Sequence, residues 1–193
     1  MLWIIRKIFR FLFFLLGWKY REQIPAGIDK AVMILSGHTS NWDFIFGMGS
    51  LDFFNRRAFF TIKKEWMVFP FAYFFRVAGA LGIDRSKKDA HDNRISAVDQ
   101  MVNLLKSMDK GYMIITPEGS RSRRDKWKSG FYHVALKAQV PIVISYIDYA
   151  KKETGLAQVL YPSGDYQKDM KIICDFYRNI SVKYPEKFAL DAS

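Results

Sequence analysis

The segment Val32–Asp43 reads VMILSGHTSNWD and joins a short apolar run to the beginning of an amphipathic one. The apolar part, Val32–Ser36, predicts a strand, and Ser40 or Asn41 is a suitable N-cap for a helix over Asn41–Phe54. Short apolar runs and longer amphipathic runs alternate in the same way along the rest of the chain, which is typical of α/β domains. We therefore expect one α/β domain with a mixed, mostly parallel central sheet flanked by helices.

The same two patterns predict the other elements. The clearest helix pattern lies in Ala90–Ser107, where apolar residues recur every three or four positions and the opposite face is polar. The remaining expected strands are Ala58–Ile62, Ala80–Asp84, Tyr112–Ile115, Ile142–Tyr149 and Ala157–Tyr161, and the remaining helices are Glu65–Val77, Gly130–Ala138 and Tyr166–Val182.

The amino-terminal segment, MLWIIRKIFRFLFFLLG, is apolar but carries Arg6, Lys7 and Arg10 on one side of a helix. Its uninterrupted apolar run, Phe11–Leu16, is far shorter than the ~20 residues that a membrane span needs. The pattern predicts an amphipathic membrane-interface helix within residues 1–20, followed by a domain over residues 21–193. The alternative is a helix that packs on the domain and never meets lipid.

Basic residues are in excess, with 30 Lys and Arg against 19 Asp and Glu and a net charge of +11. Such a surplus favours a polyanionic partner: nucleic acid, anionic lipid or a phosphorylated small molecule. The sequence has no helix-turn-helix, zinc-finger or ribonucleoprotein-type aromatic signature, and its basic residues lie beside long apolar stretches. We therefore expect a membrane surface, and no nucleic acid, as the partner.

The chain has a single cysteine, Cys174, so an intrachain disulfide is impossible. No pair of Cys or His residues lies near it at the spacing of a zinc site. We expect Cys174 to fill space in the core, and we expect no metal.

His38 and Asp43 are the first candidate catalytic residues. His38 falls in the expected strand-to-helix turn, and Asp43 in the first turn of the helix, from which its carboxylate can reach back to the imidazole. A carboxylate bonded to one imidazole nitrogen fixes the tautomer and leaves the other nitrogen to accept a proton. The alternative is a loop histidine beside an ordinary helix-capping aspartate.

Three more segments follow expected strands or form one. Arg85 ends the apolar run Ala80–Arg85 at the carboxyl end of a strand, where α/β domains bind ligands, although a solvated loop arginine is the alternative. The segment Thr116–Arg124, TPEGSRSRR, combines a flexible turn with a hydroxyl and a guanidinium, which are phosphate-binding groups. Its alternative is a basic surface loop. Val140–Ile144, VPIVI, predicts a strand with proline at its start.

Taken in this order, the four segments resemble the glycerolipid acyltransferase family, which includes the lysophosphatidate (1-acyl-glycerol-3-phosphate) acyltransferases. His38 and Asp43 match its His-x-x-x-x-Asp motif. The other blocks that resemble the family are Gly82–Arg85, Pro117–Ser122 and Val140–Val143.

The chain departs from the family pattern at two positions. Gly37 stands where many members have Asn before the histidine, and Ser120 replaces the usual Thr. Serine keeps the hydroxyl, whereas Gly37 indicates a divergent branch and leaves the acceptor lipid open.

The resemblance implies an O-acyltransferase that moves a fatty acyl group from acyl-CoA or acyl-carrier protein to the hydroxyl of a lysophospholipid or glycerophosphate-type acceptor, with 1-acyl-glycerol-3-phosphate as first choice. The donor is a substrate, and no cofactor is needed. His38 would be the general base and Asp43 its orienting carboxylate. The residues implied to bind the acceptor phosphate are Arg85, Glu118, Gly119, Ser120 and Arg121.

The apolar segment Trp66–Val77 is a candidate wall of an acyl-chain groove, or else a buried or membrane-facing helix. Together with the basic amino-terminal helix, the implied donors place the protein on membrane lipids as a peripheral or monotopic protein, at the cytoplasmic face of the inner membrane. Two other functions stay open: acylation of a different lyso-lipid, such as a lyso-aminolipid or glycolipid, and catalytically silent lipid binding on the same scaffold. A serine hydrolase is disfavoured because the sequence has no Gly-x-Ser-x-Gly elbow.

Overall fold

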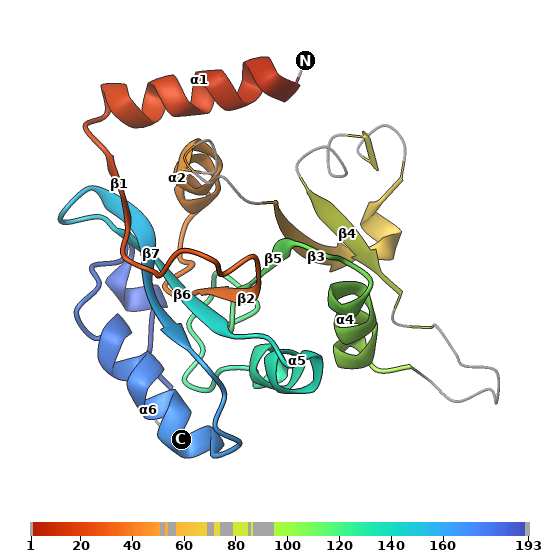
Figure 1. The fold of residues 1–193 in the computed structure, drawn as a ribbon. Helices are drawn as coiled ribbons and strands as arrows, with labels where there is room; N and C mark the ends of the chain where they lie inside the picture. Colours follow the sequence, from red (N-terminus) through yellow and green to blue (C-terminus); the bar gives the residue numbers. More distant parts are fainter. Residues whose placement is uncertain are drawn as a thin grey trace.

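The computed structural model of the chain describes residues 2–50, 53, 57–68, 72–73, 79–84, 86 and 95–191. Within these residues, seven strands form one sheet in the order β1-β7-β6-β2-β5-β3-β4 (Figure 1). The strands are β1 (Lys19–Glu22), β2 (Lys30–Leu35), β3 (Ala58–Lys63), β4 (Ala80–Ile83), β5 (Gly111–Ile115), β6 (Ile142–Asp148) and β7 (Glu153–Leu160). The helices are α1 (Leu2–Leu15), α2 (Trp42–Ser50), α4 (Ala97–Lys106), α5 (Gly130–Ala138) and α6 (Tyr166–Tyr177), with short 3-10 turns at Lys64–Trp66 and Pro185–Lys187.

The sheet is mixed and mostly parallel, as expected. The strands β6, β2, β5, β3 and β4 lie side by side and run parallel to one another. At the other edge, β7 runs antiparallel to β6, and β1 pairs in parallel with β7. Parallel strands end at the same edge of a sheet, and α/β proteins bind ligands in the crevice at that edge. The segments that follow β2, β5 and β6 therefore meet there.

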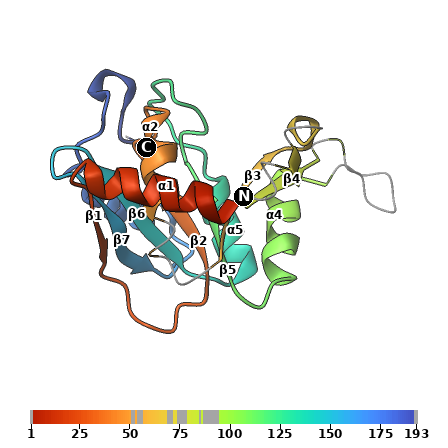
Figure 2. The same cartoon turned by 90° about the horizontal axis from the view of Figure 1, so that it is seen from above.

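Helices cover both faces of the sheet (Figure 1). Val32 and Ile34 of β2 face the main core, in which α4, α5 and α6 pack through buried residues such as Phe131 and Ile173. The opposite face carries α2, with α1 lying across it, as the view from above shows (Figure 2). Phe13 of α1 is fully buried on that side. Strand side chains alternate between faces, so β2 contributes to both layers.

All six predicted strands are present, with ends that differ by a few residues. Strand β1 was not predicted, because its sequence, KYRE, is polar and it is held to β7 through the backbone. Strand β7 begins at Glu153, earlier than expected, because the antiparallel pairing with β6 extends to the tight turn between them.

The helix predicted over Gly130–Ala138 is confirmed to the residue. Helix α4 begins later than predicted, at Ala97, because the Ser96 hydroxyl accepts a hydrogen bond from the Asp99 amide and caps it. The C-terminal helix ends at Tyr177, short of the predicted end. A helix starting at Glu65 is wrong, since Lys64–Trp66 form a 3-10 turn and residues 67–68 are not helical. Residues 72–73 are helical, as predicted, and the rest of that segment lies outside the described residues.

Candidate active site

The loop between β2 and α2 carries His38. Gly37, which precedes it, has φ +82°, a left-handed conformation that glycine adopts readily. A Cβ atom at this position would lie 2.5 Å from Cγ1 of Val182, in the segment that follows α6. The glycine that departs from the family pattern is therefore required by the close packing of this C-terminal segment against the loop.

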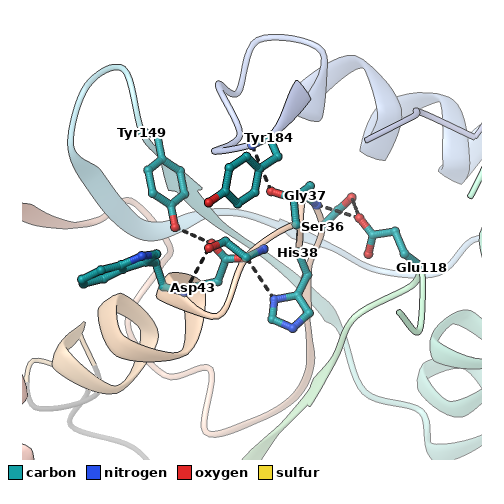
Figure 3. Close-up of polar contacts among 10 residues, drawn as sticks. Ser36, Gly37, His38, Asp43, Glu118, Tyr149 and Tyr184 are labelled. Carbon is teal, nitrogen blue, oxygen red and sulfur yellow. Dashed lines mark hydrogen bonds and ion pairs between the residues drawn. The ribbon is translucent and has the colours of Figure 1, made fainter. Parts of the chain in front are cut away.

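His38 and Asp43 lie together, as the sequence predicted (Figure 3). Nδ1 of His38 is 3.1 Å from Oδ2 of Asp43, a close contact that is not aligned as a hydrogen bond, and Nδ1 has no hydrogen-bond partner among the residues that the structure describes. The same carboxylate oxygen accepts a hydrogen bond from the Ser40 amide at 2.9 Å. Asp43 is 3% exposed and the His38 side chain 19%, so the carboxylate is buried while the imidazole reaches solvent.

A third side chain contacts the pair. The Tyr149 hydroxyl donates a hydrogen bond of 2.5 Å to Oδ1 of Asp43. Burial, and secondly the bond to Asp43, raises the pKa of this hydroxyl well above its usual value, so Tyr149 stays protonated and remains the donor. The sequence did not indicate Tyr149, because it follows β6 and lies 106 residues from Asp43.

Glu118 holds the histidine loop from the other side (Figure 3). Its Oε1 accepts hydrogen bonds from the Ser36 hydroxyl at 2.7 Å and from the Gly37 amide at 2.6 Å. Its Oε2 is buried and has no partner in the part of the chain that the structure describes. Glu118 thus fixes the backbone that carries His38, and a role as phosphate ligand stays a prediction.

The basic loop contributes to the same cavity as the dyad. Gly119, Arg121 and Lys128 line it together with His38 and Asp43. Gly119 has φ +64°, and a Cβ there would lie 2.8 Å from Nζ of Lys128. The absence of a side chain at Gly119 therefore lets the Lys128 ammonium lie close to the loop backbone. The sequence did not indicate Lys128, because nothing distinguishes it from the other cations of its loop.

Two predicted phosphate ligands, Glu118 and Ser120, are absent from the residues that line the cavity. The Ser120 hydroxyl donates a 3.3 Å hydrogen bond to the carbonyl of Ser122 within its own loop. Arg85 lies outside the described residues.

The cavity has a volume of about 480 Å³ and lies against the sheet face that carries α2. Its wall includes Met33 and Leu35 of β2, Phe60 of β3 and Ile114 of β5, and it reaches Leu156 of β7. No described residue of the predicted groove segment 66–77 lines it. The apolar surface next to the dyad is thus built by the sheet.

A family model described as Acyltransferase matches residues 18–148. This range includes the His38–Asp43 dyad as well as Glu118 and Arg121. The chain belongs to the acyltransferase family. It is 26% identical over 149 residues to a 1-acyl-sn-glycerol-3-phosphate acyltransferase from Haemophilus influenzae, covering 72% of this chain and 58% of that protein. It is 36% identical over 85 residues to a protein of the same name from Cocos nucifera, covering 42% of this chain and 26% of that one.

The chain thus spans less than two thirds of the length of these relatives. Among solved structures, the 1-acyl-sn-glycerophosphate (LPA) acyltransferase PlsC from Thermotoga maritima matches with a TM-score of 0.58 and 19% identity. The match covers 91% of this chain and 76% of that one. The likeness confirms the α/β fold with its mostly parallel sheet.

The packing at Gly37 gives a test with a matched control. Gly27→Ala adds a Cβ in open space at φ +89° and should cost only the left-handed strain, about 1–2 kcal/mol. Gly37→Ala adds the same strain and the clash with Val182, so its free energy of unfolding should fall by about 1–3 kcal/mol more. Chemical denaturation of both variants measures the difference, and equal losses would contradict the packing of Val182 on the loop.

Proposed function

We propose that this chain is an O-acyltransferase that transfers a fatty acyl group from acyl-CoA or acyl-carrier protein to the hydroxyl of a lysophospholipid or glycerophosphate-type acceptor. The acceptor that we propose first is 1-acyl-glycerol-3-phosphate. The observation that carries the proposal is the 3.1 Å contact between His38 and buried Asp43. The pair lies at a cavity that combines cations with an apolar wall. Membership of the acyltransferase family supports the same reaction class.

The dyad can act as a general base. As the acceptor hydroxyl attacks the thioester carbonyl carbon, the nitrogen of His38 that does not contact Asp43 takes the hydroxyl proton. The new C–O ester bond forms, the C–S bond breaks, and the departing thiolate takes up the proton from the imidazolium. Asp43, held by Ser40 and Tyr149, stabilises the imidazolium between these two transfers.

The cations at the cavity suit a phosphorylated acceptor. Arg121 offers a planar guanidinium and Lys128 a compact ammonium on the same wall as His38. A phosphate held there positions the acceptor hydroxyl near the base, and positioning is itself a large part of catalysis. We also assign Arg85 and the Gly119 backbone to this phosphate site, with Glu118 and Ser120, which do not line the cavity, supporting it from the loops behind.

The apolar wall suits a fatty acyl chain. A cavity of about 480 Å³ has the size and the apolar lining of small-molecule sites. A hydrocarbon chain packed against Met33, Phe60 and Ile114 is removed from contact with water, which favours its binding. We assign this wall to one of the two lipid substrates.

Helix α1 suits a membrane surface. Phe11, Phe14 and Leu15 are 64%, 54% and 67% exposed, and the chain carries a net charge of +11. Within the described ranges, no helix is both long and apolar enough to cross a bilayer. We propose that residues 1–20 lie in the interface of anionic membrane lipids, with the protein at the cytoplasmic face of the inner membrane.

The test of this function is thiol release from acyl-CoA and from acyl-carrier protein, with a panel of lyso-lipid acceptors and the products identified by mass. We expect turnover with lysophosphatidate and little with monoacylglycerol, which lacks the phosphate. His38→Ala should lower kcat by about 10²–10⁴-fold without unfolding the protein. His133→Ala, which removes an exposed histidine of α5, is the control and should keep the wild-type rate.

Other results would change the assignment. A wild-type rate in His38→Ala would exclude the dyad mechanism. Turnover with a different lyso-lipid, such as a lyso-aminolipid or glycolipid, and none with lysophosphatidate would show that the acceptor is that lipid. Lipid binding without thiol release in the wild-type protein would indicate a silent lipid-binding scaffold.

The interface helix has its own test, co-sedimentation with vesicles that contain anionic lipid. Replacing Phe11 and Leu15 by Ser removes apolar surface that the fold does not bury, so binding should fall while the melting temperature stays near that of the wild type. Tyr161→Ser, an equally exposed residue beyond β7, is the control and should bind as the wild type does. Undiminished binding of the double variant would exclude α1 as the contact.

A further inference from the structure

Tyr149 contacts the carboxylate oxygen of Asp43 that does not face His38 (Figure 3). Its hydroxyl donates to Oδ1 at 2.5 Å, whereas Oδ2 faces Nδ1 of His38 and accepts the Ser40 amide. Both oxygens of a side chain that is 3% exposed are therefore engaged. The three side chains form a continuous row from Tyr149 through Asp43 to His38.

The Tyr149 ring is held in place independently of this bond. Its backbone amide donates to the Ser181 carbonyl at 2.8 Å. Its ring packs edge-on against Trp18 and Phe46, with centroids 5.2 and 5.8 Å apart. The ring that presents the hydroxyl is thus held by contacts other than the bond to Asp43, and the position of the ring sets the position of Oδ1.

Burial and the Asp43 carboxylate keep Tyr149 a protonated donor, against the Ser40 hydroxyl and the Lys183 ammonium, which favour the phenolate. The Asp43 carboxylate accepts from its hydroxyl, and Nζ of Lys183 lies over its ring at 5.6 Å from the centroid. Burial and Asp43 raise the pKa of the hydroxyl, and Tyr184 adds to the shift in the same direction. The bond therefore persists as a phenol donating to a carboxylate.

We propose that Tyr149 is a positioning residue for acyl transfer: by fixing Oδ1, it stops the Asp43 carboxylate from rotating, so that Oδ2 keeps the His38 imidazole oriented. The proposal rests on the proposed role of His38 as the general base. Without the phenol, Oδ1 is a buried acceptor with no side-chain donor among the described residues, and the carboxylate gains by turning away from His38 or by admitting water. Orientation of the base is lost, while substrate binding is untouched.

If the Tyr149 bond were only structural, its loss would lower stability and leave the rate unchanged. The chain contains a similar hydrogen bond that serves as a comparison. The Tyr132 hydroxyl donates to Asp169 at 2.8 Å, also in the buried interior but on the α5–α6 side of the sheet. Removing that hydroxyl should lower stability alone. Removing the Tyr149 hydroxyl should lower stability and the rate of the chemical step.

The experiment compares Tyr149→Phe with Tyr132→Phe in steady-state kinetics, at a temperature where both variants are folded. Tyr149→Phe keeps the ring packing, and its kcat should fall about 10–100-fold, equivalent to about 1.4–2.8 kcal/mol. The KM values for donor and acceptor should stay within about twofold of wild type, because only the transition state loses an interaction. Tyr132→Phe should keep the wild-type kcat.

A double-mutant cycle with Asp43→Asn shows whether Tyr149 acts through Asp43. If it does, Asp43→Asn/Tyr149→Phe is no slower than Asp43→Asn, since the orienting carboxylate is already lost. A wild-type kcat in Tyr149→Phe, or additive losses in the cycle, would overturn the proposal. If the His38 and Asp43 variants are inactive but Tyr149→Phe is not impaired, only this inference fails; if the His38 variant is active, the proposed function fails with it.

Discussion

The site depends on one buried carboxylate. A charged group with 3% of its surface exposed must be matched by donors, because an uncompensated buried charge costs several kcal/mol. Asp43 is matched by the Ser40 amide, the Tyr149 hydroxyl and the His38 ring. These groups come from the loop after β2 and the turn after β6, and Asp43 itself lies in the first turn of α2, so the carboxylate ties three segments of the fold together.

A second carboxylate fixes the same loop from the opposite side. Glu118, which follows β5, accepts from the Ser36 hydroxyl and the Gly37 amide. The loop that carries His38 is thus held between Glu118 and Asp43 (Figure 3). This arrangement is possible because β2, β5 and β6 are parallel neighbours whose carboxyl ends share one edge of the sheet. The fold therefore holds His38 in a fixed position, which the proposed role as general base in acyl transfer requires.

Local patterns were enough for part of this picture. The apolar run of β2 and the amphipathic run of α5 indicated their elements, and the match of His38 and Asp43 to the family's His-x-x-x-x-Asp motif indicated their contact, which their spacing alone did not. Strand β1 has no apolar pattern, since its backbone pairing with β7 is independent of side-chain type. Tyr149 and Glu118 lie 106 and 82 residues from their partners, and only the topology of the sheet brings them together. The resemblance to the family implied Glu118 as a ligand of the acceptor phosphate, but not as the residue that holds the histidine loop.

In the proposed mechanism, Asp43 fixes the tautomer of His38. The ¹⁵N chemical shifts of the imidazole, assigned by comparison with His38→Ala, report which nitrogen carries the proton in the neutral ring. The account predicts protonated Nδ1, facing Asp43, and bare Nε2 as the base. A neutral ring with protonated Nε2 and bare Nδ1 would contradict it.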